Sequence, residues 1–309
     1  GGAHVPWWAA AITFIMALFS TVSFVSIPGE AYKNGLRLLL GTFIGPLAAL
    51  AFFYIFVRFY FQTKTFTPYN YLEKRFNYQI RAVISILYLF TRLSYLAIVL
   101  FSCSVIFKGV AGWPSWAGIV LIGFIGILYC GLGGFEAVIW TNVFQFAVLI
   151  GGIVVATILC LREIDGGVIE VFKYSFENGR GFNILSQNSD FFSFNPTVRL
   201  SFWWLLLGQL MAYMFYCSSD QMALQPLLST GSLKKARNSF INSIIVFIPV
   251  NMGLFFLGLA MFTYFSKNPM PQGNPSGDTS LFVFISMKMV SPWPGLIISG
   301  MRSEERRVG

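Results

Sequence analysis

The chain has 309 residues, of which 56% are hydrophobic and only 11% are charged, and its mean hydropathy is +0.69. A soluble domain carries about 25% charged residues, and the apolar residues here form long blocks rather than amphipathic stripes. These features exclude an ordinary soluble domain and predict a polytopic protein of the lipid bilayer. The formal net charge of +9 is then a signal of membrane topology and not of nucleic-acid binding.

Residues that support enzymatic chemistry in many proteins are sparse. His4 is the only histidine and has no partner motif, and the four cysteines fall in apolar runs without metal-ligand spacing. Clustered acids are missing, and Gly133-Gly134 matches no phosphate-binding loop. We therefore expect a protein that is not an enzyme and that uses no nucleotide cofactor.

Seven stretches are candidates for membrane spans, and about 20 apolar residues cross a bilayer. In chain order they are Trp7–Pro28, Leu36–Val57, Ala82–Phe107, Trp116–Tyr129, Ala137–Leu161, Leu200–Leu224 and Phe240–Phe265. An eighth begins near Trp293. Between the second and third stretches, the segment Tyr71–Phe76 is typical of a short helix at the membrane interface.

The first stretch begins as an apolar helix and then changes character within Ala11–Tyr32. Hydroxyl side chains interrupt its run of Phe, Val and Ile, and Pro28-Gly29 is expected to end it. Polar groups at membrane depth need an internal partner, so they gather where a helix lines a cavity or breaks. Transporters use such breaks to bind ions and solutes. We expect the rest of the chain to pack around this break, whose hydroxyl residues are Ser20, Thr21, Ser23 and Ser26.

Basic residues predict the orientation, because cytoplasmic links carry the excess of Lys and Arg. Two links are basic, and if the spans alternate they lie on the same side. That side is predicted to be cytoplasmic together with Gly1–Pro6, whereas the link Arg162–Arg199 is predicted to lie outside. The basic residues of the two links are Arg58, Lys64, Lys74, Arg75 and Arg81, and Lys234, Lys235 and Arg237.

Five motifs appear in the order VPWW, SIPGEAYKNG, YNYLEKRF, LGGFEAVIWTNVFQ and SSDQMALQPLLSTGSLKKAR. Over Val5–Met301 this set resembles the sodium:solute symporter family, and within it the bacterial branch that includes sialic acid transporters. The nearer match depends mainly on an arginine in the third stretch and on GGFEAVIWT. The resemblance implies an all-α membrane protein, a helical transporter bundle with a five-plus-five inverted repeat like that of the sodium/leucine transporters and with discontinuous core helices.

Residues 1–301 are interpreted as one transmembrane transporter domain, truncated at both ends, with about seven spans and the start of an eighth. Residues 302–309, RSEERRVG, interrupt an apolar run that has just begun and are interpreted as a non-native tail. No internal repeat is visible by direct comparison, although an inverted repeat can leave almost no trace in a sequence.

Arg92 lies inside the third stretch, where a charge near the bilayer centre costs about 2.5–3.5 kcal/mol. No acid lies at the centre of another predicted span, since Asp220 is near the cytoplasmic end of the sixth. We therefore expect no internal carboxylate for Arg92 and predict that a substrate carboxylate binds its planar guanidinium. The sialic acid branch has an arginine in a similar place with this role. Alternatively, backbone carbonyls satisfy Arg92, or it extends to an interface.

The resemblance also implies further residues of the solute site. Ser20 and Ser23 would face the cavity from the broken helix, Thr42 is a weaker candidate on the second span, and Tyr213 and Tyr216 precede a second helix break at Ser218-Ser219-Asp220. Tyr216 aligns with the aromatic residue that closes the cavity toward the cytoplasm. The alternatives are packing between helices for the hydroxyl residues and an interfacial position for the tyrosine.

Sodium is the one ion that the resemblance implies. The family's main site uses two backbone carbonyls of core helix one, which align with Met16 and Phe19, and hydroxyls of core helix eight. A second sodium ion would involve the position of Asn142, where the family usually has aspartate. An amide carries no charge to offset the cation, so the sequence departs from the family at this site.

We predict a sodium-coupled secondary active symporter of the inner (plasma) membrane that imports a small organic solute, one with a carboxylate such as sialic acid. Symport of a sugar, a monocarboxylate or another anion is the alternative within the family. A sensor that keeps this fold and signals through an attached domain is the alternative from another class. The sequence predicts no nucleic-acid partner and leaves the oligomeric state open.

Overall fold

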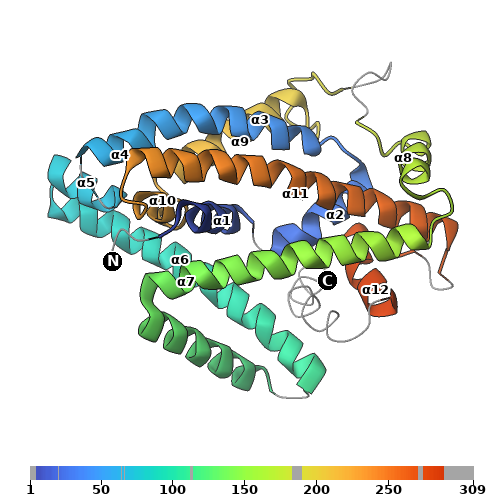
Figure 1. Ribbon diagram of the computed structural model, residues 1–309, viewed down its shortest axis with the longest axis horizontal. Coiled ribbons are helices and arrows are strands. Elements are labelled where there is room, and N and C mark those ends of the chain that lie inside the picture. Colours follow the sequence, from blue (N-terminus) through green and yellow to red (C-terminus); the bar gives the residue numbers. More distant parts are fainter. Residues whose placement is uncertain are drawn as a thin grey trace.

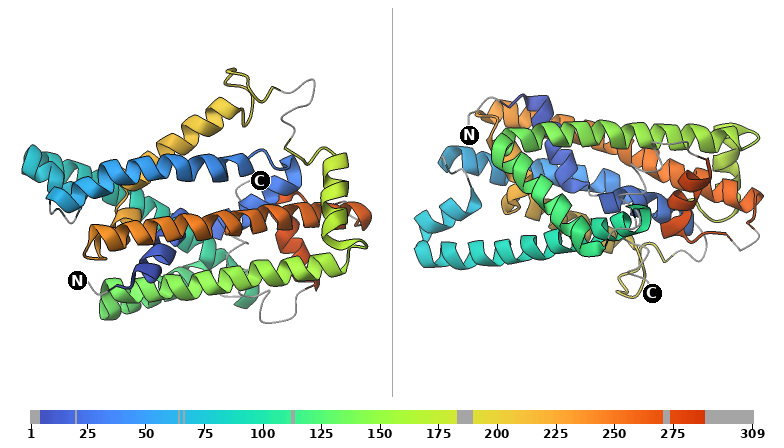
Figure 2. Two further views of the ribbon diagram at one scale, coloured as in Figure 1. Left: turned by 45° about the horizontal axis from the view of Figure 1, so that its top comes forward. Right: turned by 90° about the horizontal axis from the view of Figure 1, so that it is seen from below.

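The computed structural model describes residues 5–19, 21–63, 65, 67–111, 114–182, 190–270 and 274–288. These residues form α-helices joined by short links, with one π-helical turn and no strand among them. The long helices run roughly along one axis and build an elongated bundle (Figures 1 and 2). Four of the described helical segments are long and apolar enough to cross a membrane: Leu39–Thr63, Tyr78–Ala97, Glu136–Arg162 and Leu233–Lys267. The expectation of an all-α, multi-pass membrane protein is confirmed.

The first predicted span is divided into α1 (Trp7–Leu18) and α2 (Thr21–Asn34). Phe19 follows α1 with extended backbone angles, φ −96° and ψ 116°. A break within Ala11–Tyr32 is therefore confirmed. The expectation that Pro28-Gly29 ends the helix was wrong, because α2 continues through Pro28 to Asn34. A proline is tolerated inside a membrane helix where neighbouring helices and local adjustments satisfy the freed backbone groups.

The sixth predicted span is also discontinuous. It consists of α9 (Phe202–Ser218) and α10 (Gln221–Leu228), separated by Ser219 and Asp220. The side chain of Asp220 caps α10 by accepting a 3.0 Å hydrogen bond from the backbone N–H of Met222. The second helix break is therefore where the sequence predicted it.

The second predicted span is longer than expected. It comprises α3 (Leu39–Phe52), the π-helical turn η1 (Phe53–Val57) and α4 (Arg58–Thr63), which follow one another directly. The short helix α5 (Pro68–Arg75) comes next. It begins before the predicted Tyr71–Phe76, because the Thr67 hydroxyl accepts from the N–H of Asn70 and Pro68 occupies the first helical turn.

The third span corresponds to α6 (Tyr78–Ala111), and the fourth and fifth lie together in α7 (Ser115–Arg162). The chain turns within α7 at Gly134, whose φ of 59° and ψ of −154° are not helical. A glycine adopts this conformation with positive φ at little cost. The turn therefore falls between the two predicted spans Trp116–Tyr129 and Ala137–Leu161.

The remaining helices are α8 (Gly167–Glu177), in the predicted outside link, α11 (Leu233–Lys267), which contains the seventh span, and α12 (Gly277–Lys288). The sequence did not predict α12. Its start packs close to α2, since a Cβ atom on Gly277 would lie 2.5 Å from the carbonyl oxygen of Gly29. The predicted eighth span near Trp293 lies outside the described residues.

Two apolar clusters hold the bundle together. The first joins α1, α2, α3, α7, α8, α11 and α12 and includes Ile153, Leu257, Phe265 and Phe284. The second joins α1, η1, α4, α9, α10 and the start of α11 and includes Phe14, Phe53, Leu224 and Phe240. Helix α1 contributes to both clusters, through Ile15 to the first and Phe14 to the second, whereas α2 contributes to the first.

The ends of the bundle agree with the predicted topology. Figure 1 shows α4, α5 and α10 at one end and α8 at the other. The start of α11 is tied to the start of α1 because the Ser239 hydroxyl donates a 2.7 Å hydrogen bond to the carbonyl of Trp7. At the far end, Lys267 of α11 pairs with Glu170 of α8 at 2.5 Å. The two basic links thus lie at one end and α8 at the opposite end.

Candidate functional site

A cavity of about 660 Å³ lies where the two helix breaks meet α6. Each of these elements contributes side chains, and the lining combines apolar, hydroxyl and charged groups. Among the described residues that line it, Arg92 and Asp220 are the charged ones. The lining residues are Met16, Ala17, Leu18, Phe19, Ser23, Tyr88, Thr91, Arg92, Tyr95, Phe215, Tyr216, Asp220 and Met222.

Arg92 of α6 and Asp220 of the α9–α10 break form an ion pair across this cavity, with 2.5 Å between Nη2 and Oδ1. The expectation that Arg92 has no internal carboxylate was therefore wrong. Asp220 is near the end of its span, as the sequence indicated, but the packing of the helices brings its carboxylate into contact with Arg92. A charge at membrane depth is typically paired in this way.

The two partners differ in their exposure. The side chain of Arg92 is 31% exposed, whereas that of Asp220 is only 4% exposed. The guanidinium carbon of Arg92 also lies 4.9 Å from the centre of the Tyr88 ring, one turn away on the same helix, as in a cation–π contact. More of Arg92 than of Asp220 is therefore open to a molecule in the cavity.

Four of the predicted site residues meet Arg92 in this cavity: Ser23 of α2, Tyr216 of α9, and Met16 and Phe19 at the end of α1. Met16 lies in the last turn of α1, where carbonyl groups have no continuing helix from which to accept hydrogen bonds. Phe19 is the extended residue that follows. Carbonyl oxygens at such a break are the type of ligand that a hard cation prefers.

Other predicted site residues are not brought to the cavity wall. Thr42 of α3 and Tyr213 of α9 are buried, and Tyr213 belongs to the apolar cluster around Phe53 and Phe240. Asn142 of α7 is half-buried and does not line the cavity. Ser20 lies outside the described residues.

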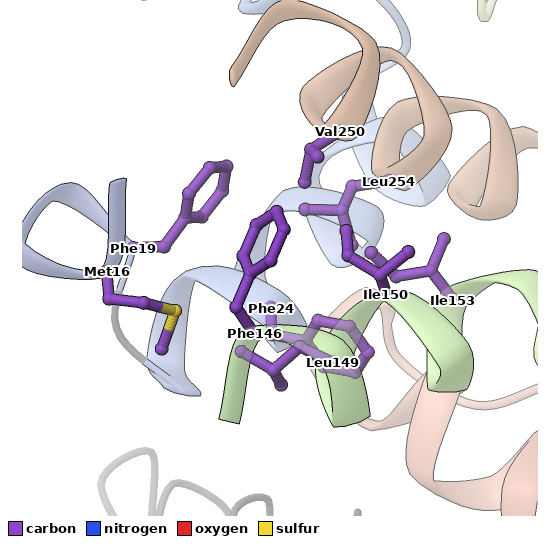
Figure 3. A pocket seen from close by; sticks show the side chains of 9 residues that line it. All are labelled: Met16, Phe19, Phe24, Phe146, Leu149, Ile150, Ile153, Val250 and Leu254. Atoms are coloured by element: carbon purple, nitrogen blue, oxygen red, sulfur yellow. The ribbon is translucent and has the colours of Figure 1, made fainter. Parts of the chain in front are cut away.

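A second, much smaller cavity of about 20 Å³ lies beside the first break, and its lining is entirely apolar. Figure 3 shows the side chains that surround it, which come from α1, α2, α7 and α11. Met16 and Phe19 border both cavities. The end of α1 is therefore packed by apolar groups on one side and faces the polar cavity on the other. The remaining lining residues are Phe24, Phe146, Leu149, Ile150, Ile153, Val250 and Leu254.

The family model of the sodium:solute symporters matches residues 1–301. The chain belongs to the sodium:solute symporter family. The family resemblance drawn from the sequence motifs is thereby confirmed, and the family is one of transporters and not of enzymes.

Relatives with known names include bacterial sodium/sialic acid symporters. The chain is 29% identical to SiaT of Proteus mirabilis, over 97% of this chain and 60% of that protein. It is 27% identical to NanT of Aliivibrio fischeri, over 97% of this chain and 58% of that one. Human sodium-coupled monocarboxylate transporter 1 is 24% identical over 96% of this chain and 48% of its own length.

A solved structure shows the same fold. The substrate-bound, outward-open state of a Na⁺-coupled sialic acid symporter aligns with a TM-score of 0.84 at 27% identity, covering 97% of this chain and 62% of that chain. The predicted sodium/leucine-transporter-like bundle with discontinuous helices is therefore confirmed. The chain spans about three fifths of the length of these bacterial relatives.

Several residues that line the cavity were not predicted from the sequence. Tyr88 and Tyr95 lie four residues before and three residues after Arg92, so helical periodicity alone places them on the same face. The sequence indicated only weakly that Asp220 belongs to the cavity. It follows Ser218-Ser219 at the predicted break, where aspartate is a preferred helix cap, but its contact with Arg92 depends on the packing of separate helices.

Proposed function

We propose that the full-length protein is a sodium-coupled symporter of the plasma membrane, the inner membrane in a bacterium, which imports an organic solute with a carboxylate, such as sialic acid. The observation that carries this proposal is the exposed part of Arg92 in a cavity between the two helix breaks. A guanidinium can bind a carboxylate through parallel N–H donors, and this geometry selects carboxylates over neutral groups.

The hydroxyl groups around Arg92 support a solute with several polar groups. Ser23, Tyr95 and Tyr216 line the cavity from three different helices, and each hydroxyl can both donate and accept. The volume of about 660 Å³ falls within the range of about 300–1,000 Å³ that is common for small-molecule sites. Size and polarity therefore suit a sialic acid.

Sodium would be a second transported substrate, moved together with the solute. The carbonyl groups of Met16 and Phe19 lie at the break of α1, beside the wall that also carries Ser23. Sodium bound there would stabilise the state that is open to the outside, and solute would then bind between α1, α6 and α9. Movement of the bundle around this site would expose it to the cytoplasm.

A small monocarboxylate is the second candidate solute. Sodium-coupled monocarboxylate transporters of Bos taurus and Homo sapiens are each 24% identical to this chain. Such a solute would use the same guanidinium but fewer of the surrounding hydroxyls. Competition of unlabelled propionate against labelled sialic acid separates the two cases, because the true solute should displace the label at the lower concentration.

The decisive experiment replaces Arg92 by glutamine or lysine in the full-length protein. Cutting one side of a desolvated charge pair costs about 2–5 kcal/mol, so affinity for the acid should fall by tens-fold or more. Arg92→Lys should also bind poorly, because an ammonium cannot reproduce the guanidinium fork. The matched control is Arg81→Gln, since Arg81 lies on the same helix but pairs with Glu73 away from the cavity.

A neutral analogue of the acid tests whether the effect is specific. It should bind wild type and Arg92→Gln about equally, because it presents no carboxylate to the guanidinium. Unchanged affinity of Arg92→Gln for the acid would contradict the proposal and leave Arg92 with a structural role.

A further inference from the structure

We propose that Asp220 sets the net charge of the solute site, so that an anionic solute binds well only together with a cation. This inference depends on the proposed function, because it assumes that an organic anion binds at Arg92. It assigns to Asp220 a role in positioning Arg92 and in making anion binding depend on sodium. Three features of the molecule support it: the fixed place of Asp220, the weak packing of α6 and the charges of the cavity.

Asp220 is held firmly in place. Its Oδ1 atom accepts both from Arg92 Nη2, at 2.5 Å, and from the backbone N–H of Met222, at 3.0 Å. The second of these bonds caps α10, and the side chain is 4% exposed. The Oδ1 atom with these two donors is fixed to the helix break, and only a small part of the side chain is open to the cavity.

Arg92 depends on Asp220 more than a residue of a packed helix would. The segment Tyr78–Ala97 of α6 has none of its residues buried inside the described structure. Helix α6 packs mainly on α7 and α5, and the ion pair links it across the cavity to the α9–α10 break. Asp220 thus decides where the guanidinium lies, which makes it a positioning residue for the solute site.

The charges of the cavity then follow. Arg92 and Asp220 are the charged groups among its described lining residues, and their charges cancel. A bound monoanion gives the site a net charge of about −1, which is costly in a region of low dielectric constant. A sodium ion at the carbonyls of Met16 and Phe19, which line the same cavity, would restore neutrality. If Arg92 were not already neutralised, the anion could bind without sodium.

The substitution Asp220→Asn tests this in the full-length protein. Asparagine keeps the oxygen that caps α10 and can still accept from Arg92, so it removes the charge and little else. The measurement is the equilibrium Kd of labelled sialic acid in sodium and in choline buffer. We expect wild type to bind sialic acid far more weakly in choline than in sodium. In Asp220→Asn the ratio of the Kd in choline to the Kd in sodium should shrink by about tenfold or more, because the interaction with a unit charge within a few ångström is worth that much at protein dielectric constants.

Two further variants make the result specific. Asp220→Glu restores the charge and should restore the sodium dependence, even if the absolute affinity falls. Glu73→Gln removes the same charge from a partly exposed pair with Arg81, outside the cavity, and should leave the Kd ratio unchanged. A ratio in Asp220→Asn equal to that of wild type would overturn the inference.

A measurement on wild type alone keeps the inference testable if Asp220→Asn does not fold. The Kd of a neutral amide analogue should depend on sodium less than the Kd of the acid does, and equal dependence would overturn the inference. If wild type binds neither sialic acid nor propionate in any buffer, the proposed function itself is contradicted. Binding with an unchanged ratio refutes only the role of Asp220.

Discussion

The phenol of Tyr60 donates a 2.5 Å hydrogen bond to the backbone carbonyl of Ser218, the last residue of α9. Tyr60 is buried and lies in α4, just after the π-helical turn. The bond therefore connects the second span to the helix break that carries Asp220. Carbonyl groups at the end of a helix have no partner within it, so a tyrosine from a neighbouring span satisfies one of them.

Tyr60→Phe should destabilise the folded protein. The substitution keeps the ring but leaves the Ser218 carbonyl without its donor, and an unsatisfied buried group costs about 1–3 kcal/mol. Thermal unfolding in detergent should show a lower midpoint than wild type. Tyr54→Phe is the control, because Tyr54 belongs to the π-helical turn but is exposed. Equal midpoints for wild type and Tyr60→Phe would show that the bond contributes nothing.

Gly258→Ala should be strongly destabilising for a change of one methyl group. A Cβ atom at this position of α11 would overlap the carbonyl oxygen of Pro28 and would lie 2.6 Å from the Cβ of Ala31. The two helices would have to move apart, and overpacking of this kind costs about 1–3 kcal/mol.

The control for this prediction lies on the same helix. A Cβ atom on Gly253 would meet only Ile153, at an ordinary 3.7 Å. Gly253→Ala should therefore be neutral or stabilising, by up to about 1 kcal/mol from helix propensity. Thermal midpoints of the two variants, measured side by side, check the difference. A Gly258→Ala midpoint as high as that of Gly253→Ala would contradict the close approach of α2 and α11.

Cysteine labelling in whole cells should place α8 outside and the start of α11 in the cytoplasm. Asn178 and Lys235 are both exposed, and they lie at opposite ends of the bundle, at the end of α8 and the start of α11 (Figure 1). In a cysteine-free background, a membrane-impermeant reagent should modify Asn178→Cys but not Lys235→Cys until the cells are opened. Modification of position 235 and not 178 in intact cells would reverse the predicted orientation.

The ion pair between α8 and α11 should make stability depend on pH in the acid range. The hydrogen bond from Lys267 Nζ, helped by the charge of Lys267, holds the pKa of Glu170 below its ordinary value. Because the pKa is lower in the folded state, the pair contributes stability above the unfolded value of about 4.3, and this is lost as pH falls through the folded pKa.

Glu170→Gln should therefore unfold at a slightly lower temperature than wild type at neutral pH, and the difference should shrink as the pH falls below the ordinary glutamate pKa of about 4.3. High salt should reduce it as well, since the pair is open to solvent. Glu177→Gln is the control, because Glu177 is exposed on the same helix and forms no ion pair in the described part of the chain. A constant difference between Glu170→Gln and wild type from pH 7 to about pH 3 would contradict the assignment.

Much of the fold could be predicted from local patterns. Long apolar blocks predicted the spans, and the hydroxyl residues around Ser23 predicted that the first span is broken, because each of these signals lies within one segment. The interval between the fourth and fifth apolar blocks placed the turn inside α7 for the same reason. The end of α2 was mispredicted at Pro28, since the cost of a proline inside a helix depends on what surrounds it.

Local sequence patterns predicted only part of the candidate site. A charged residue within an apolar span pointed to Arg92 without any structure, because an arginine at membrane depth must have a partner. The identity of that partner could not be read from the chain, since Arg92 and Asp220 are 128 residues apart. Their contact depends on the tilt, rotation and offset of α6 against the α9–α10 break, which arise from helix packing and are not encoded in hydropathy.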